Sequence, residues 1–138
     1  MTDDIKYCYP HSNVLINKLG IRNEEKLFQA EKKLTMLRLL ELQRQPVRGN
    51  FDLPHLCWIQ QYIFQDLYEW AGQIRTVEIA KGTMFCKAEF IETNANALFS
   101  KLAENDFHKE QGDETVVKRL AYYFSEINAL HPFREGNG

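Results

Sequence analysis

Apolar residues recur at intervals of three and four along four stretches of this 138-residue chain. That spacing places them on one face of an α-helix. The stretches run from 24 to about 42, from 54 to about 70, from 88 to about 104 and from 114 to about 130, and proline or glycine lies between them. The pattern predicts a mostly α domain, and the length fits one domain.

Each expected helix has its own apolar stripe and its own end signals. Asn23 and Asp113 are expected N-caps, and the second helix is expected to end at Ala71-Gly72. The four stripes are Leu27, Ala30, Leu34 and Leu37, with Glu41 breaking the first; Leu56, Ile59, Ile63, Leu67 and Trp70; Ile91, Ala95, Leu98 and Leu102; and Val116 or Val117, Leu120, Phe124 and Ile127.

One short stretch has a different period. Residues 75–79 alternate and are β-branched, which predicts a strand. Residues 80–83 read as a turn, and 84–86 as a second short strand. A lone hairpin is marginal in water, so it is expected to lie on the helices with one edge open to pairing.

Composition excludes several classes of partner. A net charge of −2 and a pI near 6.1 give no electrostatic reason to expect nucleic acid. The aromatic residues of the second helix are therefore read as core and not as a base-stacking platform. No apolar run suits a membrane. Three widely spaced cysteines argue against a disulfide framework and against a zinc site, and favour a cytoplasmic protein.

The last eight residues combine parts suited to phosphate chemistry. Pro132 disfavours the α region at the preceding residue, so the fourth helix is expected to end at Leu130 or His131. Gly136 and Gly138 allow positive φ, and successive amides in such a turn can form an anion-binding nest.

Two side chains complete this set. Glu135 can hold Mg²⁺ together with substrate phosphates, and His131 can take a proton from an incoming hydroxyl. The set predicts transfer of a phosphate-containing group from a nucleotide to a hydroxyl.

Residues 131–138 resemble the signature loop of the Fic (filamentation induced by cAMP) family, H-P-F-x-D/E-G-N-G-R/K-x-x-R. The seven specified positions present here all match. Residues 66–72, 81–86 and 126–130 resemble the segments that precede the family's β-hairpin flap, form it, and lead into the loop. The resemblance implies a Fic-type helical domain with a small β-hairpin flap, which transfers AMP from ATP to a Ser, Thr or Tyr hydroxyl of a target protein.

The resemblance also implies roles for single residues. His131 would deprotonate the target hydroxyl, and Glu135 would coordinate Mg²⁺. The flap, Ile79 to Phe85, would hold the target protein by strand pairing. Residues that would contact ATP are the anion-hole residues Gly136, Asn137 and Gly138, Asn128 beside the nucleotide, and Lys81 and Gly82 on the flap.

The two basic residues that complete the family pattern fall beyond Gly138. We therefore expect a domain truncated after the signature loop: an irregular segment at 1–23, then a Fic domain at 24–138 that is incomplete at its C-terminus. Such a chain should bind ATP weakly. The family's inhibitory pattern, S/T-x-x-x-E-G/N, matches only at 100–105, between flap and loop, which we read as coincidence. A toxin controlled by a separate small antitoxin is preferred to a C-terminal inhibitory helix.

Other functions remain open at this stage. The loop could use another nucleotide donor, or the chain could be a catalytically impaired binding domain. A metallohydrolase is disfavoured, because His131 and Glu135 are not on one continuous helix and no third ligand is evident. We expect a bacterial cytoplasmic protein, with delivery into a host cell as the alternative.

Overall fold

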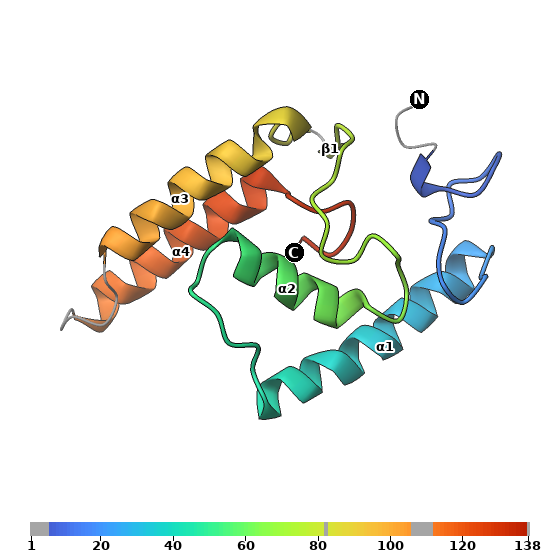
Figure 1. Cartoon of the computed structure of the whole chain (residues 1–138), viewed down its shortest axis with the longest axis horizontal. Helices are drawn as coiled ribbons and strands as arrows, with labels where there is room; N and C mark the ends of the chain where they lie inside the picture. The colour runs from blue at the N-terminus through green and yellow to red at the C-terminus, as the bar shows by residue number, and fades with distance from the viewer. Residues whose placement is uncertain (1–5, 82, 106–111, 138) are drawn as a thin grey trace. The chain divides into compact units, whose positions relative to one another are not determined.

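A computed structural model describes residues 6–81, 83–105 and 112–137 (Figure 1). The chain divides into two compact units, one formed by Met1–Gly49 with Pro54–Gln73 and the other by Asn50–Leu53 with Ile74–Gly138. Helices dominate both units, and the strands among the described residues form one small hairpin. The predicted mostly α class is confirmed. Within these residues, no helix combines the length and the apolar character that a membrane span requires.

Helix α1, Glu24–Arg44, is the longest element of the first unit. Its N-cap is Asn23, as expected, and the Asn23 side chain accepts a hydrogen bond of 2.9 Å from the Lys26 amide. The predicted stripe is only partly right. Leu27 is buried, whereas Leu37 is 58% exposed. Helical spacing identifies one face of a helix, but whether another element covers that face depends on the rest of the fold.

Helix α2, Leu53–Phe64, is shorter than predicted. The chain leaves the helix at residue 64 and continues through turns, where the Leu67 amide donates to the Phe64 carbonyl at 3.0 Å. Two carbonyls just past the helix are taken by the N-terminal segment. Lys18 donates from its amide to Leu67 at 2.7 Å and from Nζ to Gln65 at 2.8 Å. The expectation that α2 extends to Ala71-Gly72 is wrong, because long-range partners compete for these carbonyls.

Two polar contacts tie α1 to residues 65–73. The Tyr68 side chain is almost fully buried, and its hydroxyl donates to Glu31 at 2.7 Å. Arg38 donates from Nε and Nη2 to the two oxygens of Asp66, at 2.8 and 2.9 Å. This bidentate pairing lowers the pKa of Asp66.

In the second unit, α3, Ile91–Asn105, and α4, Asp113–Leu130, pack side by side and run antiparallel (Figure 1). A short 3₁₀ turn, η2, Ala88–Phe90, leads into α3. The third predicted stripe is confirmed at Ile91, Ala95 and Leu98, which are buried, while its last residue, Leu102, is partly exposed. The N-cap of α4 is Gly112 rather than the expected Asp113, which is already helical.

The predicted stripe of α4 is wrong at two of its positions, and the side chain of Val116 lies outside the described residues. Leu120 is 55% exposed and Phe124 is 67% exposed. Among the residues of α4 whose side chains the structure describes, the buried ones are Tyr123 and Leu130. Apolar residues occupy more than one face of this helix, so the three-and-four spacing alone did not identify the face that packs against α3.

The flap is a hairpin of two-residue strands, β1, Ala80–Lys81, and β2, Thr83–Met84, paired antiparallel. The strand predicted at 75–79 is absent. Its alternation is nevertheless real, because Arg75 and Val77 are buried while Thr76 and Glu78 are exposed. The segment has no regular secondary structure and pairs with a loop instead of a strand, because Arg75 donates its amide to the Pro132 carbonyl at 2.9 Å.

Candidate active site

The loop that follows α4 begins with a sharp change of direction at His131. The helix ends at Leu130, and the His131 amide donates to the Ile127 carbonyl at 3.0 Å. His131 then adopts the left-handed conformation, with φ 47° and ψ 61°. Pro132 disfavours the right-handed α region at this position, so the helix cannot continue. The expectation that the helix ends at this point is confirmed.

The loop is closed by the side chain of Asn137. Its Oδ1 accepts from the Phe133 amide at 2.7 Å, and its Nδ2 donates to the Phe133 carbonyl at 2.6 Å. Phe133 itself is only 3% exposed and anchors the loop to the core. Gly136 has φ 74°, a conformation that glycine adopts without steric cost. The loop is therefore held from both ends, with a positive-φ turn between them.

Glu135 is the acidic residue of this loop, and its carboxylate is partly exposed. One carboxylate oxygen accepts from the Gly136 amide at 3.2 Å. Among the described residues, no three histidine, cysteine or acidic side chains gather into a group that could hold a metal ion. A single carboxylate suits Mg²⁺, which commonly takes one or two carboxylates, with phosphate oxygens and water as its other ligands.

The His131 side chain lies against the base of the flap. Its imidazole stacks on the Phe85 ring with centroids 3.9 Å apart and planes 8° from parallel. The Phe85 amide donates to the Ile79 carbonyl at 3.1 Å, and the Cys86 amide donates to the Ala129 carbonyl at 3.2 Å. The flap is thus joined at its base to the end of α4. The Phe85 ring fixes the plane of the His131 imidazole.

Sequence reasoning missed the structural roles of Phe85 and Arg75. The sequence predicts Phe85 as part of a returning strand and of the flap, and Arg75 as a strand residue, without the contacts that each makes. The signal for Arg75 was present, because alternation places it on the same side as Val77. A charged residue on the apolar side of such a segment requires partners in the interior.

The other predicted site residues are Asn128 on α4, Lys81 and Gly82 on the flap, and Gly138. Asn128 lies on α4 one turn before His131 and lines a shallow groove of about 530 Å³ with Leu120 and Phe124, a groove that His131 does not line. The backbone of Lys81 pairs with Thr83 in the hairpin. The predicted contacts of Gly82 and Gly138 lie outside the described residues.

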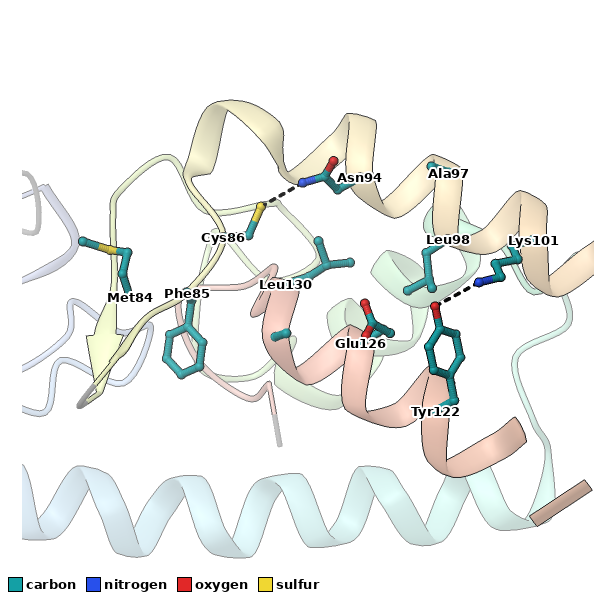
Figure 2. A pocket seen from close by; sticks show the side chains of 11 residues that line it. Met84, Phe85, Cys86, Asn94, Ala97, Leu98, Lys101, Tyr122, Glu126 and Leu130 are labelled. Atoms are coloured by element: carbon teal, nitrogen blue, oxygen red, sulfur yellow. Dashed lines mark hydrogen bonds between the residues drawn. The ribbon is translucent and has the colours of Figure 1, made fainter. Parts of the chain in front are cut away.

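A second groove, of about 620 Å³, lies between α3, α4 and the flap (Figure 2). Phe85 and Leu130 line it, so it adjoins the His131 site without including the histidine. Lys101 of α3 donates to the Tyr122 hydroxyl of α4 at 3.1 Å, and this hydrogen bond raises the pKa of Lys101. The groove is lined by apolar side chains such as Leu98 and Leu130 and by one residue of each charge, Lys101 and Glu126.

The fold and the loop place the chain in a known class. A sequence profile of the Fic/DOC family matches residues 50–138, more than half of the chain. The chain belongs to the Fic/DOC family. The match includes the flap and the loop residues 131–138.

Similar proteins share more than the loop. The Salmonella typhimurium protein named "Probable protein adenylyltransferase Fic" is 46% identical over 134 residues, which are 96% of this chain and 66% of that protein. Protein adenylyltransferase VbhT of Bartonella schoenbuchensis is 38% identical over 133 residues, 96% of this chain and 28% of VbhT. The chain therefore spans less than two thirds of the length of either relative.

A solved structure has the same fold. It is the N-terminal Fic domain, with bound ADP, of a VirB-translocated Bep effector protein from Bartonella quintana. It superposes with a TM-score of 0.89 at 26% identity, and the match covers 96% of this chain and 70% of that domain.

Proposed function

We propose that this protein is a protein adenylyltransferase, which transfers AMP from ATP to a Ser, Thr or Tyr hydroxyl of a target protein. The target hydroxyl oxygen forms a bond to the α-phosphorus, the bond from that phosphorus to the bridging oxygen breaks, and pyrophosphate leaves. The observation that carries the proposal is the imidazole of His131, held by a stacked ring at the start of a closed Gly-Asn-Gly loop. Relatives named protein adenylyltransferases support it.

Each residue of the loop has a role in this reaction. His131 takes the proton of the target hydroxyl as the new bond forms. The amides around Gly136 and Asn137 bind phosphate oxygens, since a positive-φ turn can direct neighbouring N–H groups to one anion. Glu135 would hold Mg²⁺, which when bound neutralises phosphate charge. ATP as the donor is consistent with the ADP bound to the Bartonella quintana domain.

The target protein is proposed to bind along the flap from Ile79 to Phe85. Met84 of β2 is 61% exposed, and a short open hairpin edge can accept an added strand. Residues Asn128, Lys81, Gly82 and Gly138 are proposed to border the nucleotide, as the family resemblance implies. The strand pairing would place the target hydroxyl beside the imidazole.

We propose that the Fic domain begins at residue 24. The family profile starts at residue 50, but α1 is joined to residues inside the profile by the Tyr68–Glu31 and Arg38–Asp66 contacts. Removing α1 would leave the Tyr68 hydroxyl and the Asp66 carboxylate without these partners. The helix therefore belongs with the domain.

We also propose that the protein is a cytoplasmic bacterial toxin held inactive by a separate small antitoxin. The inhibitory pattern at 100–105 lies within α3, which packs along α4, and this supports reading it as coincidence. Delivery into a host cell is the alternative, suggested by the VirB-translocated relative. Co-purification of the protein with a small partner encoded beside it would support the first arrangement.

The test is transfer of label from α-labelled ATP, with Mg²⁺, to protein. His131→Asn should abolish labelling, and His11→Asn is the matched control. Both histidines have positive φ, 47° and 57°, a conformation that asparagine also adopts. If no nucleotide in a panel of ATP, GTP and UTP gives labelling that depends on His131, the proposal is wrong. His131-dependent labelling from GTP or UTP alone would identify a different donor.

A further inference from the structure

Among the described residues, Arg75 has the largest fully buried side chain, and this side chain ends in a guanidinium. It stays charged in a protein interior, so it must be compensated by close partners. It donates from Nε to the His131 carbonyl at 2.6 Å, from Nη1 to Val77 at 2.7 Å, and from Nη2 to Cys86 at 2.6 Å and Leu130 at 3.1 Å. One side chain thus contacts the segment before the flap, the residue just after the flap and the end of α4.

These contacts complete the C-terminal end of α4. The last carbonyls of a helix have no partner within the helix. The Ala129 carbonyl accepts from the Cys86 amide, and the Leu130 carbonyl accepts from Arg75. A cation is also favoured at this end, because the helix dipole is negative there. The C-terminal end of α4 is therefore capped by the Cys86 amide, just after the flap, and by the Arg75 side chain, from the segment before the flap.

We propose that Arg75 is a positioning residue that fixes the distance and orientation of His131 relative to the flap. This inference rests on the proposed function of His131 as the base. His131 is held in a left-handed conformation that non-glycine residues rarely adopt, and the Arg75 bond to its carbonyl supports that conformation. The same guanidinium holds the Cys86 carbonyl, next to Phe85, whose ring covers the imidazole.

The consequence is a geometric link between the base and the target-binding edge. Loss of the Arg75 contacts leaves the flap base joined to α4 by the Cys86–Ala129 hydrogen bond but loosens it and the His131 backbone, so the distance between the imidazole and the strand edge is less firmly fixed. Small displacements of a reacting group cost rate and leave remote binding contacts intact. The structure therefore predicts a loss in kcat with little change in KM for ATP.

The experiment compares Arg75→Gln and Arg75→Lys with Lys118→Gln. The control removes one charge from an exposed side chain of α4. The first readout is the NMR shift of the His131 ring protons, which the Phe85 ring current displaces upfield. Arg75→Gln should lose this displacement and about a hundredfold in kcat. Arg75→Lys should be intermediate, because lysine keeps the charge but lacks the planar fork. The control should change neither.

A folded Arg75→Gln variant with the wild-type ring shift and wild-type kcat overturns the proposal. If that variant does not fold, the Lys variant decides in the same way. A third arm needs no variant. In the wild-type protein, the Cys86 and His131 amides should exchange hydrogen with one shared opening free energy, and clearly different values overturn the proposal. The NMR and exchange arms need no nucleotide, so they decide the role of Arg75 even if the protein transfers nothing.

Discussion

Asn137 offers the sharpest test of how the loop is built. Its side chain makes two hydrogen bonds to the Phe133 backbone, at 2.7 and 2.6 Å. Each such bond contributes about 1 kcal/mol net, so Asn137→Ala should cost the closed loop about 2 kcal/mol relative to open forms. With 1.4 kcal/mol for each factor of ten, the closed-to-open ratio should fall by roughly 30-fold.

Two measurements read this change. Hydrogen exchange of the Phe133 amide should accelerate by up to about 30-fold, because its acceptor is removed. The apparent affinity for ATP with Mg²⁺, measured by calorimetry, should weaken by no more than the same factor, since only the closed loop presents its amides. The substitution leaves Glu135 and His131 in place, so the loss would come from loop geometry.

Two further variants sharpen the result. Asn137→Asp keeps an oxygen for the Phe133 amide but places a second oxygen against the Phe133 carbonyl, so it should also be impaired. Asn96→Ala removes an exposed asparagine of α3 and should behave as wild type. If Asn137→Ala keeps both the Phe133 protection and the ATP affinity of wild type, the two side-chain bonds do not hold the loop.

Three other predictions concern the first unit. Asp66→Asn should lower stability by about 1 kcal/mol. Because Arg38 lowers the pKa of Asp66 in the folded state, the wild-type advantage should be complete above about pH 5 and decline as pH falls below about 4, as urea unfolding at several pH values would show. Gly72→Ala should destabilise the protein by more than about 1 kcal/mol, since φ at Gly72 is 83° and the new Cβ would lie 3.0 Å from the Cys57 carbonyl oxygen. An unchanged midpoint of thermal unfolding would contradict this prediction. Tyr68→Phe should cost about 1 kcal/mol in the same assay, through its lost bond to α1.

Some features of this protein follow from sequence because their causes are local. Helix hydrogen bonds join residues four apart, so the span of α1 and the cap at Asn23 could be predicted closely. Pro132 acts on the residue before it, which located the end of α4 at His131. The signature loop is likewise contiguous, so its resemblance to the family pattern could be identified before its geometry was known, and the family match confirmed that resemblance.

Other features depend on partners that are distant in sequence. Residues 75–79 alternate as a strand does, but a strand also needs a neighbour, and the Arg75 amide bonds to a loop more than fifty residues later. The exposed apolar face of α4 could not be told from its buried face, because both have helical spacing. Only the tertiary structure decided that a buried guanidinium would cap α4 and join the flap to His131, since the carbonyls that accept from it come from separate segments.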